Sequence, residues 1–92
     1  MASRKKIKVV YRKLGKQKAW GQCHDDCIEI DERLSGKKHL EILNHEIIHF
    51  LFPSLSEADV IRKSILLTNT LWFQGYRRTD NDNSEPLQDG SL

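Results

Sequence analysis

The stretch from residue 40 to residue 52 constrains the fold of this chain more than any other. Its sequence, LEILNHEIIHFLF, places apolar side chains on almost every side of a helix, and a helix of that kind is buried in a protein core. The exceptions include His45, Glu46 and His49. Because burying polar groups without partners is costly, the sequence predicts a dedicated partner for these three side chains.

The spacing of these residues predicts a metal site. At 3.6 residues per turn, His45 and His49 lie about 40° apart around the helix axis and about 6 Å apart along it. Two imidazoles so placed can share one tetrahedral zinc ion, and Glu46 projects beside them toward a metal-bound water. The pattern H-E-x-x-H is typical of zinc hydrolases. The alternative is a chance match, with core histidines that bond to backbone.

A catalytic zinc site commonly has three protein ligands and a water, so a third ligand is expected. Glu57 is the first strong candidate, because a chain reversal at Phe52-Pro53 would return a second helix antiparallel to the first, with its first turn beside the histidines. Glu57 could instead form a capping box with Ser54, but we favour ligation. Asp59, and then His24 from the sheet, are the fallback ligands.

The other segments predict a single α+β domain. Residues 7–14, 19–23 and 27–31 have the β-branched or alternating composition of strands. The second strand can pair back on the first, which gives a small, mainly antiparallel sheet of about three strands. Two packed helices follow: one over about residues 37–51, and an amphipathic one that ends before Gly75.

Charge is distributed unevenly along the 92 residues, although the net charge is only +2. Lysine and arginine crowd the first twenty residues, which contain no acid, and the last thirteen residues contain acids but no lysine or arginine. We expect a flexible basic lead over 1–6, a domain over 7–78 and a disordered acidic tail over 79–92. The basic N-terminal strand could contact nucleic acid or another anionic partner, although solubility and edge protection are the simpler explanation.

No apolar run reaches the length of a membrane span, and the basic N-terminus leads into no signal-peptide core. We therefore expect a cytoplasmic protein without membrane contact. Cys23 and Cys27 are too few and too close for a disulfide framework. With His24 between them they still lack the spacing of a zinc pattern, so no second metal site is expected. His39 is expected to face solvent.

H-E-I-I-H with a glutamate on the following helix resembles the gluzincin clan of zinc metallopeptidases. The short sheet, the F-P-x-L-x-E turn and the single further helix are also similar to small single-domain phage and prophage proteins and minimal gluzincins. The resemblance covers about residues 7–78 and implies a zincin-like fold. It implies zinc as the cofactor, with His45, His49 and Glu57 as ligands and Glu46 as general base and acid.

The same resemblance implies a peptide or protein substrate that adds as an extended strand along residues 27–31, and the host-cell cytoplasm as the location if the protein is phage-encoded. Compared with thermolysin-like enzymes, the spacing from His49 to the glutamate is shorter, and the subdomain that forms the far wall of the cleft is missing. No motif identifies the transition-state stabiliser, for which Tyr76 and Arg77 are the candidates.

The predicted function is a zinc-dependent metallopeptidase that hydrolyses peptide bonds through a metal-bound water. The alternative is a zinc-stabilised, non-catalytic binding module whose basic N-terminal strand contacts nucleic acid or a host protein. Glu46 favours the enzyme, because a structural zinc site needs the two histidines but has no use for that carboxylate.

Overall fold

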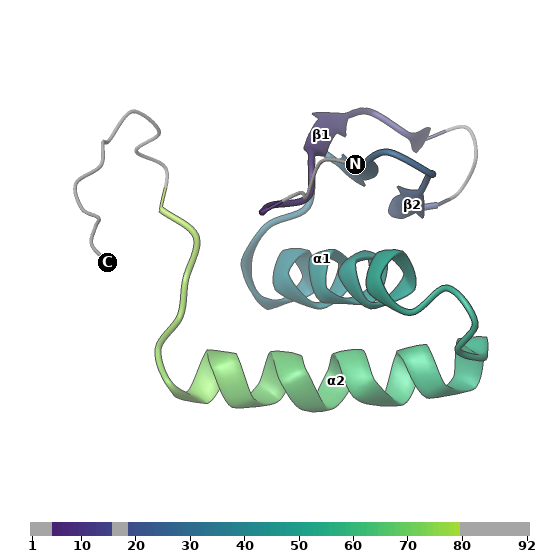
Figure 1. Cartoon of the computed structure of the whole chain (residues 1–92). Helices are drawn as coiled ribbons and strands as arrows, with labels where there is room; N and C mark the ends of the chain where they lie inside the picture. The colour runs from purple at the N-terminus through teal and green to yellow at the C-terminus, as the bar shows by residue number, and fades with distance from the viewer. Residues whose placement is uncertain (1–4, 16–18, 80–92) are drawn as a thin grey trace.

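The computed structural model of the chain describes residues 5–15 and 19–79. The elements in chain order are β1 (Val9–Arg12), β2 (Gly21–Cys23), β3 (Ile28–Asp31), α1 (Gly36–Leu51) and α2 (Glu57–Phe73). They stack in three layers, with α1 between the sheet and α2 (Figure 1). The predicted class, an α+β fold with a small sheet followed by two packed helices, is confirmed. Most of the predicted basic lead and all of the predicted acidic tail after residue 79 fall outside the described residues.

The central strand of the sheet is β3, and the strand order is β1-β3-β2. It pairs in parallel with β1 and antiparallel with β2. The second strand therefore does not pair back on the first as expected, and the sheet is mixed. The physical reason is burial: Ile28 and Ile30 of β3 are completely buried, and only the middle position places both of them under α1 with a strand on each side.

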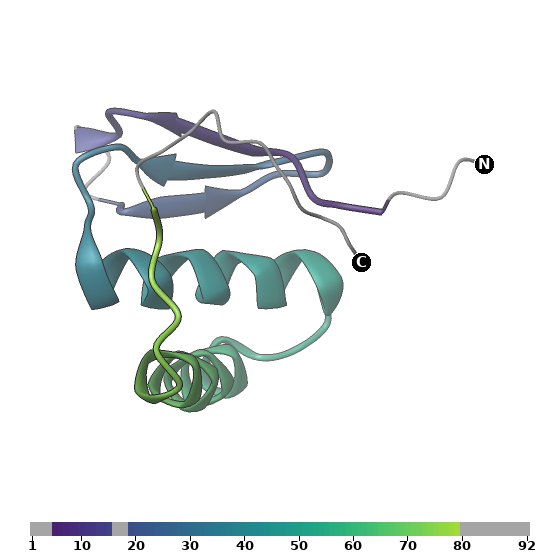
Figure 2. The same ribbon diagram turned by 90° about the vertical axis from the view of Figure 1, so that its left-hand side faces the viewer.

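The two helices cross at a steep angle, since α2 runs across the view in Figure 1 and is seen along its axis in Figure 2. The expected chain reversal at Phe52-Pro53 is nevertheless present, because α1 and α2 run in opposite directions across the view in Figure 1. The face that α2 turns to α1 carries Val60, Ser64 and Thr68, all of them buried. Small side chains allow this close crossing, and the amide of Asn44 on α1 donates to the Thr68 hydroxyl at 3.0 Å.

A polar pair also ties α1 to the sheet. His39 is only 5 % exposed, and its Nε2 atom lies 2.8 Å from the hydroxyl of Tyr11 on β1. The prediction that His39 faces solvent was wrong, because a tertiary hydrogen bond from the sheet compensates for its burial. Neither helix in the described part of the chain is long and apolar enough to cross a membrane.

Candidate metal centre

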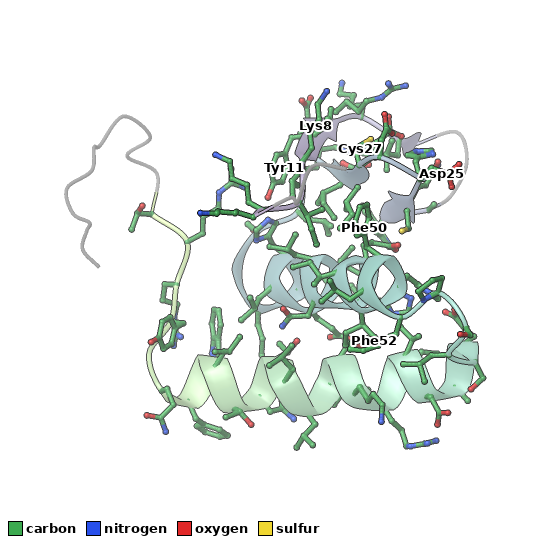
Figure 3. The ribbon with its side chains drawn as sticks, in the orientation of Figure 1. Lys8, Tyr11, Asp25, Cys27, Phe50 and Phe52 are labelled. Atoms are coloured by element: carbon green, nitrogen blue, oxygen red, sulfur yellow. The ribbon has the colours of Figure 1, made fainter. Side chains whose placement is uncertain are left out.

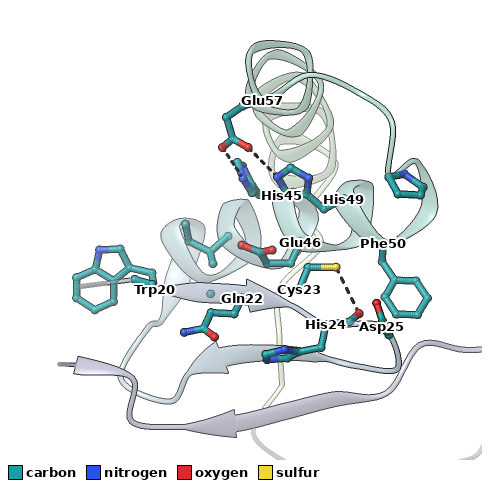
Figure 4. A pocket seen from close by; sticks show the side chains of 14 residues that line it. Trp20, Gln22, Cys23, His24, Asp25, His45, Glu46, His49, Phe50 and Glu57 are labelled. Carbon is teal, nitrogen blue, oxygen red and sulfur yellow. Dashed lines mark hydrogen bonds and ion pairs between the residues drawn. The ribbon is translucent and has the colours of Figure 1, made fainter. Parts of the chain in front are cut away.

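Three predicted ligands meet where the C-terminal half of α1 faces the first turn of α2. The Nε2 atom of His45 lies 3.2 Å from one carboxylate oxygen of Glu57, and the Nε2 atom of His49 lies 2.9 Å from the other. All three candidate ligand atoms lie within 4.8 Å of one another. Figure 4 shows the carboxylate of Glu57 facing the two imidazoles. In the described part of the chain this is the only group of three such side chains that could hold a metal.

Local structure at the start of α2 explains why Glu57 is available. The N-cap residue is Ser56, whose hydroxyl accepts a hydrogen bond from the backbone N–H of Asp59 at 3.1 Å. The alternative capping box between Ser54 and Glu57 is therefore not formed, and the Glu57 carboxylate is left to the histidines. The fallback ligand Asp59 turns to Arg62 instead.

Glu46 lies on the sheet side of the histidine pair. Glu46 is only 8 % exposed. This burial raises the pKa of its carboxyl group, and the neighbouring imidazoles of His45 and His49 act in the opposite direction. The backbone of β2 passes directly over it: a Cβ atom added to Gly21 would lie 3.0 Å from Cγ and 3.2 Å from Oε2 of Glu46. Figure 4 shows the Glu46 carboxylate between the histidines and β2.

The histidines, Glu46 and Glu57 line one pocket of about 830 Å³, which is large enough for several side chains of a ligand. Its opposite wall is the edge strand β2, and its two ends carry Trp20 and Phe50. The strand expected to receive a substrate, at residues 27–31, is β3, which has a neighbour on each side. That expectation was wrong, and within the described residues the edge strand at this pocket is β2.

Comparisons of the chain with protein-family models, with curated proteins and with solved structures found no match. The function must therefore be inferred from the site itself.

The donor set and its spacing fit a divalent metal ion. Two imidazole nitrogens and one carboxylate oxygen are ligands that zinc accepts. On a tetrahedral ion with ligand distances of about 2.0–2.2 Å, ligand atoms lie roughly 3.3–3.6 Å apart. The distances of 3.2 Å and 2.9 Å from Glu57 to the histidines are close to that separation. A small adjustment of the exposed Glu57 side chain would accommodate an ion.

The structure does not bring the two predicted transition-state stabilisers to this site. Tyr76 and Arg77 follow the C-terminus of α2, whereas Glu57 begins that helix. They line a different pocket, and the guanidinium of Arg77 lies over the ring of Trp72. A helix of seventeen residues is about 26 Å long, so neither side chain reaches the histidines.

His24, the remaining fallback ligand, lines the pocket but turns away to Glu29, 3.2 Å from its Nε2 atom. The nearby thiol of Cys23 also lines the pocket, and burial together with the charge of Glu46 raises its pKa. Cys23 and Cys27 are free cysteines, and they join no candidate metal group in the described residues.

Gly21 is the residue of the candidate site that the sequence analysis missed. A glycine inside a strand commonly marks a close approach of backbone to another group, so its place in A-W-G-Q-C was the available indication. The group that it approaches, Glu46, is separated from it in the sequence by the rest of β2, by β3 and by the first part of α1, and only the packed structure reveals the contact.

Proposed function

We propose that this protein is a zinc-dependent peptidase. One observation carries the proposal: a single pocket is lined by the three candidate metal ligands, by the carboxylate of Glu46, which is not one of them, and by the edge strand β2. A site that served only to stabilise the fold would be closed around its metal. Here the ligand Glu57 is 61 % exposed, so the group opens to the pocket.

The residues that would hold zinc are His45, His49 and Glu57, three protein ligands as in catalytic sites that keep a position for water. When bound, zinc would supply Lewis acidity toward a substrate carbonyl and would lower the pKa of a water molecule. The two imidazole nitrogens disfavour magnesium and calcium, which take oxygen ligands, and the mixed nitrogen and oxygen donors are a set that zinc accepts.

Glu46 is the residue that we assign to proton transfer. Its carboxylate is adjacent to the ligands but is directed to the pocket wall at β2, where a substrate backbone would lie. A carboxylate oxygen there can accept a proton from the attacking water and return it to the leaving amine. The backbone of Gly21 lies so close to this side chain that a Cβ atom on Gly21 would come within 3.2 Å of Oε2 of Glu46, which leaves room on that side only for a glycine.

Strand β2 is the element that we assign to substrate binding. One of its edges pairs with β3, and within the described residues the other edge has no strand partner. An extended peptide can add to such an edge through main-chain hydrogen bonds, with alternate side chains entering the pocket. Trp20, which is 45 % exposed at one end of β2, would then contact a substrate side chain.

The rival proposal, a non-catalytic binding module, rests on the basic N-terminal strand. β1 forms the edge of the sheet opposite β2, and Lys8 next to it and Arg12 within it are exposed. Contact with nucleic acid or a host protein along β1 would leave the metal pocket uninvolved. The arrangement around Glu46 is what favours the peptidase.

The test combines metal content with cleavage. Zinc per chain would be measured by elemental mass spectrometry, and cleavage with casein, for the wild type and for His45→Ala, Glu57→Ala and Glu46→Gln. We expect about one zinc per wild-type chain, loss of zinc in the first two variants, and retained zinc with cleavage reduced at least about 100-fold in Glu46→Gln.

His24→Ala is the matched control for metal content, because His24 lines the pocket without joining the ligand group; it should keep its zinc. Purified wild-type protein that takes up no zinc would overturn the metal site. Zinc uptake with cleavage that does not depend on Glu46 would overturn its role, and zinc uptake without any cleavage would favour the binding module.

A further inference from the structure

A second pocket lies at the opposite end of α2 from the metal centre, between the start of α1 and the segment that follows α2. Its volume is about 410 Å³, within the range of small-molecule sites. Its apolar wall consists of Leu40, Leu43, Leu71 and Trp72, and its polar wall of Tyr11, His39, Tyr76, Arg77 and Arg78. None of its described lining residues is acidic, so the pocket does not neutralise its own arginines.

The turn after α2 places the arginines at this pocket. Gly75 has a φ of +92°, its N–H donates to the carbonyl of Trp72, and the N–H of Tyr76 donates to the carbonyl of Leu71, both at 3.0 Å. This is the Schellman arrangement that ends helices at a glycine. It directs the following residues away from the helix axis and up toward the sheet (Figures 1 and 2).

The two arginines differ in what they have available for a ligand. Arg77 lies 3.5 Å from the centre of the Trp72 ring and donates to the carbonyls of Trp72 and Tyr76 at 2.9 and 3.0 Å. Arg78 lies 4.4 Å from the centre of the Tyr11 ring, and it makes no hydrogen bond or ion pair with any described residue. Stacking on a ring leaves the in-plane N–H donors of a guanidinium unused, so Arg78 can offer a fork of donors to an anion.

Tyr11 and His39 supply one more donor. Burial raises the pKa of Tyr11 and, together with the charge of Arg78, lowers that of His39, so near neutral pH the pair holds one O–H and one N–H. Their mutual contact of 2.8 Å uses one of these hydrogens. If the Tyr11 hydroxyl donates to Nε2, the proton of the neutral His39 ring is on Nδ1, and this N–H is left over. If the Nε2–H of His39 donates to the Tyr11 oxygen instead, the Tyr11 O–H is left over. Both tautomers leave one donor without a partner in the described residues.

We propose that this pocket binds a small organic anion, in which a carboxylate or a phosphate is attached to an apolar, ring-sized body. Arg78 and the remaining donor of the Tyr11–His39 pair bind the anionic group. The leucines and Trp72 contact the body. Figure 3 labels Tyr11 on the sheet side of this region. The inference is independent of the metal centre and of the proposed peptidase activity.

Titration calorimetry on the full chain tests the proposal with three probes that share one ring system: 2-naphthoate, 2-naphthyl phosphate and the uncharged 2-naphthamide. We expect at least one of the two anions to bind about tenfold or more tightly than the amide, as the loss of a charge-assisted hydrogen bond implies. The tighter of the two anions identifies the preferred group. Equal binding of all three probes, or no binding of either anion at millimolar concentration, would overturn the proposal.

Two variants assign the binding to named groups. Arg78→Gln, at an exposed position, should weaken the binding of the two anions about tenfold and leave the binding of the amide unchanged. Tyr11→Phe should weaken the binding of the anions several-fold, because it removes the hydroxyl group from the Tyr11–His39 pair. Arg62→Gln is the matched control, since Arg62 is an exposed α2 arginine that pairs with Asp59 away from this pocket. Anion binding that is unaffected by Arg78→Gln would show that the site is elsewhere.

Discussion

Gly21 lies directly against the side chain of Glu46. A methyl group at Gly21 would approach Cγ of Glu46 to 3.0 Å and Cγ2 of Ile42 to 2.9 Å, closer than such atoms normally come. Strand β2 and helix α1 can therefore pack at this distance only with a glycine at this position. The contact joins the proposed substrate strand to the proposed catalytic carboxylate.

Gly21→Ala should displace Glu46 without removing any ligand of the metal. We expect kcat/KM for casein to fall by about 10- to 100-fold, because displacements of about 1 Å have effects of that size, while zinc per chain stays unchanged. The free energy of unfolding should fall by about 1–3 kcal/mol from overpacking. Gly15→Ala is the control, since its Cβ would meet only the end of the Arg33 side chain, at 3.3 Å. Full activity in Gly21→Ala would contradict the role given to this contact.

Zinc should stabilise the fold, because only the folded chain brings Glu57 to the two histidines. At free zinc about 100-fold above Kd, the folded state gains about 2.7 kcal/mol. Each kcal/mol raises the Tm of a domain of this size by about 4–8 °C, so we expect a rise on the order of 10 °C or more in a thermal melt of metal-free protein. The rise should vanish in His49→Ala and persist in His24→Ala. An equal rise in His49→Ala would place the bound zinc elsewhere.

The buried hydrogen bond between Asn44 and Thr68 should stabilise the helix crossing that presents Glu57. Asn44→Ala leaves the Thr68 hydroxyl, which is 1 % exposed, without its partner, and we expect a loss of about 1–3 kcal/mol in urea unfolding. The double change Asn44→Leu with Thr68→Val should recover part of this loss, because no polar group is then left unpaired. Thr70→Val, at an exposed position of α2, should change stability by less than about 0.5 kcal/mol.

Asp31 should make stability depend on pH in the acid range. Its carboxylate accepts hydrogen bonds from the Arg33 side chain at 2.9 and 2.7 Å and from the backbone N–H of Leu14 at 3.1 Å. Hydrogen bonding to Arg33, the largest cause, holds the pKa of Asp31 well below its usual range. A carboxyl group whose pKa is lowered in the folded state takes up its proton at a lower pH than it does in the unfolded state. Its contribution to the free energy of unfolding is therefore complete above the unfolded pKa of about 3.9 and is lost as the pH falls below that value.

Asp31→Asn should therefore reduce stability at pH 6, and the difference from the wild type should shrink between about pH 5 and pH 2. Urea unfolding at several pH values measures it. Glu32→Gln, at the exposed neighbouring position, is the control and should leave the acid-range slope nearly unchanged. A difference that stays constant down to pH 2 would mean that the charge of Asp31 has no part in its effect.

The sequence alone determined the elements near the candidate metal centre. Both histidines and Glu46 belong to one turn of one helix, and their relative placement follows from helical geometry, which is local. The position of Glu57 just after a proline turn also limited where its carboxylate could go, and the structure places it against both imidazoles. The α+β class and the approximate bounds of the helices were predicted for the same reason: hydrophobic periodicity is a local property.

Only the tertiary structure decided which strand lies in the middle, how steeply α2 crosses α1 and which residues meet from distant parts of the chain. Tyr76 and Arg77 follow the glutamate in the same helix-and-turn segment, yet the length of α2 carries them to the second pocket. His39 has the sequence neighbours of a surface residue, and a tyrosine from β1 keeps it buried. Contacts of this kind depend on packing between elements, and no local pattern encodes the free energy of burying one face against another.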